Sequence, residues 1–249
     1  MSELTQIAGI PVLAGHGVMH PERPVVIVIH GMSTTAETLR DGFPEADDGL
    51  ARVYWRLPIL RDGRDAVGAR RQRDLFRDLF APVVAESRAE LGRLVAAFAP
   101  RPVGLFGFSI GALISLWGAA DQSAVRAAVA AAGVPSLEYL IDFFPDYDWL
   151  QPDVLAERRR HDLTRHSERL AQRPTLILHG DRDETATWSL MAPFAEGLAR
   201  EEPLLHPFER FAHVRHRLTA DGPDEARDLE RLRARAVAFL REHLVGPTG

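Results

Sequence analysis

The sequence contains no cysteine among its 249 residues. A disulfide framework, a thiol nucleophile and a thiolate metal site are therefore excluded. Lysine is also absent, so all 30 basic residues are arginines. No run of about 18 uncharged apolar residues occurs, and the N-terminal residues lack a basic segment followed by an apolar one. We therefore expect a cytoplasmic protein that does not enter a membrane.

Composition limits the classes of partner. The formal net charge is -5, which gives no electrostatic reason to expect nucleic acid or an anionic membrane surface as a partner. With 46% hydrophobic residues, the chain can build one large core, so we expect a single domain over residues 1–249. Asp142, Asp146 and Asp148 lack a nearby histidine to complete a site, and neither a metal nor a cofactor is expected. The oligomeric state is left open.

The most informative pattern is a Gly-x-Ser-x-Gly motif at residues 107–111. An apolar run precedes it and a second apolar run without a helix breaker follows it, which is the pattern of a buried strand leading into a core helix. Gly107 and Gly111 allow a tight turn that lifts the serine side chain out of the sheet and places it beside a helix N-terminus. This context predicts that Ser109 is a nucleophile.

A nucleophilic serine needs a base and a carboxylate, and both follow later in the chain. Residues 174–180 have the pattern of a second buried strand, and Asp183 follows it as the expected acid, ahead of Asp181 and then Glu184. A last strand is expected at residues 204–208. His213 follows it in a loop and is the expected base, and it is favoured over His216, which falls where a helix or its approach should begin.

A third motif is the strand-like run from Val25 that ends in His30-Gly31-Met32. Together the three motifs resemble the α/β-hydrolase superfamily, specifically its small esterase, dienelactone-hydrolase-like and prolyl-oligopeptidase-like members. The resemblance implies that the backbone N–H groups of Met32 and Ile110 form the oxyanion hole. The chain departs from the family in having Ala212, where glycine commonly precedes the histidine, and Glu184 to Trp188 after the acid, where an apolar residue and a proline are common.

Alternating strand and helix patterns predict an α/β protein with the α/β-hydrolase fold, in which helices cover both faces of a mostly parallel central sheet. We expect a helix at residues 34–39 with Ser33 as its cap, a surface loop at 59–73, a helix at 74–98 divided or kinked near Pro82, and a long terminal helix at 225–244.

Residues 134–169 interrupt this alternation and are expected to form a short, cap-like insertion after the sixth strand. Phe143, Phe144, Tyr147 and Trp149 cluster there, and they either line a pocket for an apolar acyl or aryl group or pack the insertion onto the body. His161 and His166 are expected at the surface.

These roles predict a serine hydrolase that cleaves a carboxylic ester with a small or medium acyl group, through an acyl-serine intermediate formed by a Ser-Asp-His triad. Two alternatives remain. One is a serine peptidase, amidase or thioesterase, and the other is a slow-turnover ligand sensor built on a hydrolase fold. In each case the partner is a small molecule.

Overall fold

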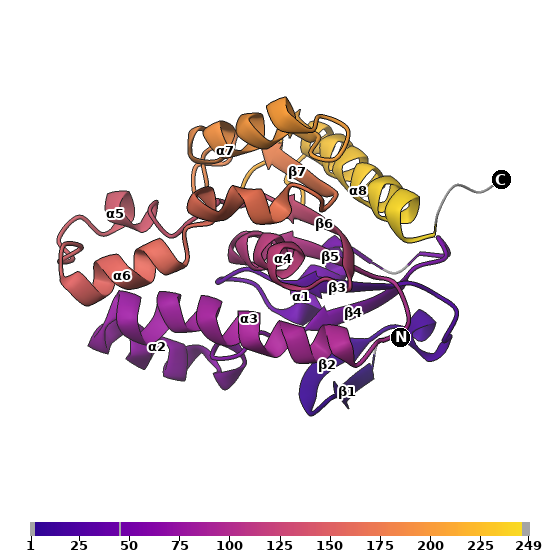
Figure 1. The fold of residues 1–249 in the computed structure, drawn as a ribbon, viewed down its shortest axis with the longest axis horizontal. Coiled ribbons are helices and arrows are strands. Elements are labelled where there is room, and N and C mark those ends of the chain that lie inside the picture. The colour runs from indigo at the N-terminus through magenta and orange to yellow at the C-terminus, as the bar shows by residue number, and fades with distance from the viewer. Residues whose placement is uncertain (1–2, 45, 246–249) are drawn as a thin grey trace.

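The computed structural model describes residues 3–44 and 46–245. A central sheet contains eight strands in the order β1-β2-β4-β3-β5-β6-β7-β8 (Figure 1). β1 pairs with β2 and β2 with β4 in antiparallel fashion, and all other pairs are parallel. The strands are β1 Glu3–Ile7, β2 Ile10–Ala14, β3 Val25–Ile29, β4 Ala51–Trp55, β5 Val103–Phe108, β6 Val125–Ala131, β7 Thr175–Gly180 and β8 Phe208–Phe211.

Helices cover both faces of this sheet, as the sequence predicts. The α-helices are α1 Ala36–Gly42, α2 Arg64–Arg73, α3 Ala81–Ala96, α4 Ile110–Asp121, α5 Leu140–Phe143, α6 Pro152–Arg160, α7 Trp188–Glu201 and α8 Pro223–Leu244. Shorter 3-10 segments are η1 His16–Met19, η2 Leu60–Asp62 and η4 Leu163–Leu170, and η3 Leu75–Phe80 is a π-helical turn. None of the described helices is long and apolar enough to span a membrane.

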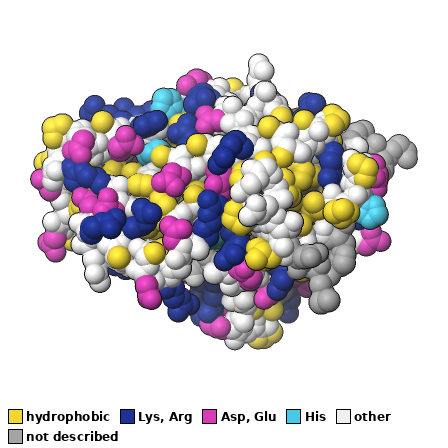
Figure 2. All heavy atoms as spheres, turned by 90° about the horizontal axis from the view of Figure 1, so that it is seen from below, with side chains coloured by type: hydrophobic (Ala, Val, Ile, Leu, Met, Phe, Trp, Pro, Cys, Tyr) yellow, Lys and Arg dark blue, Asp and Glu magenta, His cyan; other side chains and the backbone are white. Residues whose placement is uncertain are grey.

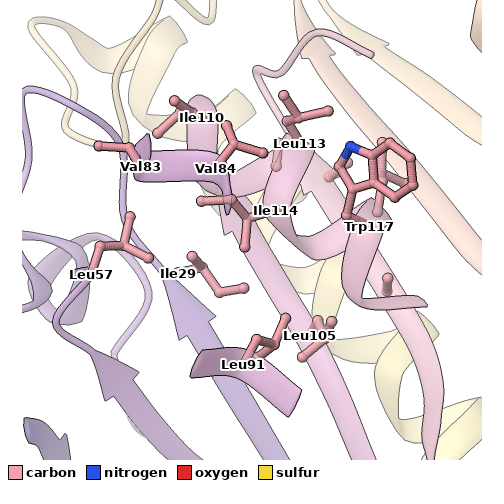
Figure 3. Packing of buried hydrophobic residues seen from close by; sticks show 14 of the residues in the cluster. Ile29, Leu57, Val83, Val84, Leu91, Leu105, Ile110, Leu113, Ile114 and Trp117 are labelled. Carbon is pink, nitrogen blue, oxygen red and sulfur yellow. The ribbon is translucent and has the colours of Figure 1, made fainter. Parts of the chain in front are cut away.

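The alternation of side chains along β3 divides the core into two layers. Val25, Ile27 and Ile29 face the layer that contains α3, α4 and α7, whereas Val26 and Val28 face the layer that contains α1 and α8. All five side chains are fully buried, which explains why the strand is a continuous apolar run. Figure 3 shows the first layer, where side chains of α3 and α4 pack over β3 and β5.

Three local expectations fail at segment boundaries. Residues 64–73 form α2 instead of a loop; none of its side chains is buried, so no apolar periodicity marks it. Thr35, not Ser33, caps α1, because its side chain accepts the backbone N–H of Thr38. The final strand, expected at residues 204–208, lies instead at Phe208–Phe211 as β8. By contrast, the helix expected at 74–98 is divided just before Pro82, as predicted, because the π-helical turn η3 ends at Phe80 and α3 begins at Ala81.

The 134–169 insertion lies between β6 and β7 and contains α5, α6 and most of η4 (Figure 1). Its attachment to the body is polar as well as apolar. Arg77 of η3 contacts the carboxylate of Asp153 and the side chain of Gln151, while the Tyr147 hydroxyl donates to Asp74 at 2.7 Å. The expectation that His161 is a surface residue is wrong, because its side chain is only 1% exposed.

Candidate functional site

Ser109 lies at the sharp turn between β5 and α4, in a left-handed conformation with φ of 58° and ψ of -124°. A non-glycine residue rarely adopts a positive φ, so the surrounding structure must hold it. The backbone is so closely packed at this turn that both motif positions require glycine. A Cβ at Gly107 would lie 2.0 Å from the Gly111 carbonyl oxygen, and a Cβ at Gly111 would lie 2.3 Å from the Ile29 carbonyl oxygen. The predicted strand-to-helix turn is therefore present.

A histidine and a carboxylate lie in line with this serine. His216 Nε2 is 2.9 Å from Ser109 Oγ, and His216 Nδ1 is 2.8 Å from Asp183 Oδ2. Because an ionised carboxylate can only accept, Nδ1 carries the proton in this arrangement and Nε2 is free to accept the serine hydroxyl. The ring also packs against Phe108, with centroids 5.2 Å apart.

Asp183 is held rigidly for its contact with the imidazole. Its side chain is fully buried, and its Oδ1 accepts the backbone N–H groups of Thr185 at 2.9 Å and Ala186 at 2.7 Å, which leaves Oδ2 for the histidine. The ring of His179 lies nearby and donates to the Ala186 carbonyl; burial lowers the pKa of His179, which favours its neutral form. The two alternative acids lie at the surface, where Asp181 pairs with Arg210 and Glu184 is exposed.

The expectation that His213 lies beside Ser109 is wrong. Its Nδ1 and its backbone N–H both contact Asp228 Oδ2 on α8, each at 3.0 Å, so the ring is engaged with the terminal helix. Burial alone would raise the pKa of Asp228, but the hydrogen bonds from His213 lower it below its ordinary value. His213 thus belongs to a second pair, and His216 occupies the position next to Ser109.

The error arose because a helix, or the approach to one, was expected near His216. The strand ends at Phe211 and α8 begins only at Pro223, so the loop that carries both histidines spans residues 212–222. Gly222 followed by Pro223 was the signal that could have revealed this, because proline is common in the first turn of a helix. His216 is therefore well inside the loop and not at the start of a helix.

Helix α8 anchors this loop through the buried carboxylate of Glu225. Glu225 accepts the backbone N–H groups of Arg215 and Asp221 and the guanidinium of Arg217. Burial opposes the charge, but these three groups outweigh it and lower the pKa of Glu225 to about 2. Glu225 and Asp228 together tie both sides of His216 to one helix. The sequence did not single out either carboxylate.

The backbone segments that carry the two expected oxyanion-hole residues, Met32 and Ile110, lie close to Ser109. A Cβ at Gly31 would meet Ser109 Cβ at 2.8 Å, which places the residue before Met32 directly against the nucleophile, and Ile110 is the first residue of α4. Among the described residues, neither N–H group donates an intramolecular hydrogen bond. His30 supports this turn, since its ring contacts the Gly31 carbonyl and accepts the N–H of Leu57.

The aromatic residues of the insertion divide into anchors and an exposed side chain. Trp149 is buried and lies edge-on against Phe76, with centroids 5.5 Å apart, while Tyr147 also contacts Phe76 and donates to Asp74. Phe144 packs partly buried against the same core, whereas Phe143 is 48% exposed. Tyr147 and Trp149 therefore attach the insertion to the body. Within the described part of the chain, no cluster of three or more potential metal ligands is found.

Comparison with known proteins gives likenesses over nearly the whole chain, although no family model matches it. "Esterase YjfP" of Escherichia coli strain K12 is 27% identical, over 97% of this chain and 98% of that protein. The crystal structure of TT1662 from Thermus thermophilus has a TM-score of 0.70 at 22% identity and is covered to 98% in both chains. Acylaminoacyl peptidase of Pyrococcus horikoshii has a TM-score of 0.65 at 15% identity, over 96% of this chain and 40% of the longer one. The fold expected from the sequence is confirmed.

Proposed function

We propose that the chain is a member of the α/β-hydrolase superfamily and a serine hydrolase that cleaves carboxylic esters through an acyl-serine intermediate. The observation that carries this proposal is the continuous line of contacts from Ser109 Oγ through His216 to Asp183. The likeness to a protein named an esterase supports the same reaction class.

In the acylation step, Ser109 attacks the carbonyl carbon of the ester while His216 Nε2 takes its proton. The base is needed because a serine hydroxyl is a weak nucleophile near neutral pH. Asp183 keeps the proton on Nδ1 and stabilises the imidazolium that forms. The imidazolium then protonates the departing alkoxide, which leaves as an alcohol and yields the acyl-serine. In the second half, His216 removes a proton from water, which attacks the acyl group; the imidazolium then returns this proton to Ser109 Oγ as the acid leaves.

Stabilisation of the tetrahedral oxyanion falls to the N–H groups of Met32 and Ile110. Both lack an intramolecular acceptor in the described residues, so they have no protein hydrogen bond to break when the oxyanion forms. Ile110 also begins the twelve-residue helix α4, whose N-terminus favours negative charge. The donors are backbone groups, so the hole depends on the shape of two turns instead of on side-chain identity.

We further propose that the 134–169 insertion shapes the acyl site, with Phe143 and Phe144 as its apolar contacts. Phe143 is the exposed large hydrophobic side chain of this aromatic group, and it contacts Tyr139 edge-on with centroids 5.9 Å apart. Tyr147 and Trp149 act indirectly by fixing the insertion on η3. An apolar group of small or medium length is the expected guest.

The direct test is hydrolysis of p-nitrophenyl esters from acetate to octanoate by the wild-type protein and by Ser109→Ala. We expect activity that depends on Ser109 and has a clear optimum of chain length. Asp183→Asn should lower kcat about 10⁴-fold, because the wrong tautomer of His216 is then favoured. The matched control Asp181→Asn changes a surface carboxylate and should leave kcat within about twofold.

The competing functions give different outcomes in the same experiment. A p-nitroanilide or thioester turned over faster than every ester would favour an amidase, a peptidase or a thioesterase. Stable retention of the ester without release of p-nitrophenol would favour a ligand sensor. Ester hydrolysis that persists unchanged in Ser109→Ala would contradict the proposed nucleophile.

A further inference from the structure

A cavity of about 480 Å³ lies at the far end of helix α4 from the nucleophile. Asp121, the last residue of α4, is one of its lining residues, and twelve residues of helix at 1.5 Å each place it about 18 Å from Ser109 along the axis. The cavity lies where α3 and α4 of the body meet α6 and η4 (Figure 1). It is therefore separate from the proposed catalytic site and lies on the seam between the body and the 134–169 insertion.

Three arginines from three different elements line this cavity. Arg88 comes from α3, Arg160 from the end of α6 and Arg169 from η4. Arg88 and Arg169 are held in place by Asp121, through contacts of 2.9 Å and 2.8 Å. The Arg88 guanidinium also lies 3.6 Å from the centroid of the Trp117 ring, whose position on α4 is shown in Figure 3. These two guanidinium groups are thus fixed before any ligand arrives.

The remaining charge near the cavity is only partly neutralised. Arg160 has a single, long contact with Glu157, at 3.5 Å, and its side chain is 68% exposed. Among the ionised groups that face the cavity or its histidines, three arginines therefore stand against the carboxylates of Asp121 and Glu157. Figure 2 shows that on the face that carries α2 and α3, arginine and acidic side chains are otherwise intermingled. The lining of this cavity therefore carries more positive than negative charge, unlike the mixed surface of that face.

A buried histidine in the cavity wall lacks a hydrogen-bond partner. The side chain of His161 is 1% exposed, and neither ring nitrogen makes a hydrogen bond, although Nε2 lies 3.2 Å from Glu157 Oε2. Buried polar atoms without partners are uncommon in proteins and often mark a site for a ligand or water. The pKa of His161 is lowered to about 4, chiefly by burial. The nearby charges of Arg88 and Arg160 also lower this pKa, whereas the Glu157 carboxylate raises it. His166, from η4, completes the titratable groups of the wall.

We propose that this cavity is a second binding site, which takes a small organic anion through its carboxylate or phosphate oxygens. Guanidinium groups bind both oxyanions in forked geometry, and each arginine here retains N–H donors beyond those its present partner uses. Arg160 is the principal contact, because its own carboxylate partner is distant and exposed. The ligand would join α6 and η4 of the insertion to α3 and α4 of the body.

The probes for this site are inorganic phosphate and citrate, measured by calorimetric titration against chloride at equal ionic strength. We expect saturable binding of at least one probe by the wild-type protein and by Ser109→Ala alike. Arg160→Gln should weaken it about five- to tenfold, since it removes one charge-assisted contact that is partly exposed to solvent. Arg159→Gln is the matched control: this exposed neighbour on α6 is outside the cavity wall and should leave the affinity unchanged.

A second readout follows the histidine itself. The anion offsets the repulsion that Arg88 and Arg160 exert on His161, so binding should raise the pKa of His161 in an NMR titration. The proposal is overturned if neither probe binds saturably at millimolar concentration, or if Arg159→Gln and Arg160→Gln weaken binding equally. Loss of binding in Ser109→Ala would place the anion at the catalytic serine and would also overturn it.

Discussion

His213 and Asp228 form a second histidine–carboxylate pair three residues from the proposed catalytic histidine, with Nδ1 and Oδ2 3.0 Å apart. The pair has the composition of a catalytic dyad, but its carboxylate belongs to the terminal helix and its ring is engaged there. Its role is to hold the loop 212–222, and this difference in role can be measured.

Replacement of the two histidines should have opposite consequences. His216→Ala removes the base and should lower kcat by about 10⁴-fold or more while leaving the melting temperature nearly unchanged. His213→Ala should keep kcat within about tenfold, but it removes the imidazole from the buried carboxylate of Asp228, which keeps the backbone N–H of residue 213 and Arg231, and it should lower the melting temperature. Steady-state kinetics and thermal denaturation of both variants check this. The reverse order of kcat would restore His213 as the base.

Glu225→Gln should loosen the loop that carries His216. Its carboxylate accepts hydrogen bonds from Arg215, Arg217 and Asp221, so we expect a melting temperature about 3 to 8 °C lower at neutral pH and a kcat about tenfold lower. The matched control Asp224→Asn alters an exposed carboxylate one position earlier, whose only described partner is Arg227, and should change neither quantity appreciably.

The pH dependence of this effect has a definite sign. The pKa of Glu225 is about 2 in the folded protein and 4.5 in its unperturbed state. The stabilisation is therefore fully present above about pH 4.5 and is lost as the pH falls toward 2. Melting temperatures of wild type and Glu225→Gln should converge over that interval. A constant difference from pH 7 to pH 2 would show that the charge of Glu225 is not what holds the loop.

Two glycine-to-alanine substitutions should change the free energy of unfolding in opposite directions. A methyl group at Gly111 would lie 2.3 Å from the Ile29 carbonyl oxygen, which is backbone and cannot move aside, so Gly111→Ala should cost about 3 kcal/mol or more and disrupt the site. Gly197 lies within α7 with nothing within 4 Å of its added Cβ, so Gly197→Ala should gain about 0.5 to 1 kcal/mol. Chemical denaturation measures both. A stable, active Gly111→Ala would contradict the crowded turn.

Arg77→Gln should release the 134–169 insertion from the body. Arg77 contacts Asp153, Gln151 and Tyr147, all of which belong to the insertion. We expect faster proteolytic cleavage within residues 134–169 and a higher KM for the longer esters, with kcat for acetate little changed. Arg73→Gln provides the control, since the one ion pair of its exposed side chain with the described residues is to Asp78 of η3. Equal proteolysis of the two variants would show that Arg77 does not fasten the insertion.

Patterns of neighbouring residues predicted the parts of the site that depend on local geometry. The turn at Ser109 is specified by Gly107 and Gly111 within five residues, and the buried strands by uninterrupted apolar runs. The final strand was misplaced because β8 has only one buried residue in four and so gives little periodicity. Helix α2 was missed for a similar reason, because none of its side chains is buried and the sequence shows no apolar stripe.

The amino-acid sequence alone was enough to predict the layered α/β architecture, the turn at Ser109 and the placement of Asp183 just after β7, because each of these depends on side-chain periodicity or on glycine within a few neighbouring residues. The packing of the chain, which the sequence does not reveal, places His216 and not His213 beside Ser109. Both histidines lie in the loop 212–222. Which of them reaches Ser109 depends on how Asp228 and Glu225 of α8 hold that loop by hydrogen bonds. The loop conformation therefore depends on a helix that packs against the sheet, and the spacing of residues within the loop does not predict it.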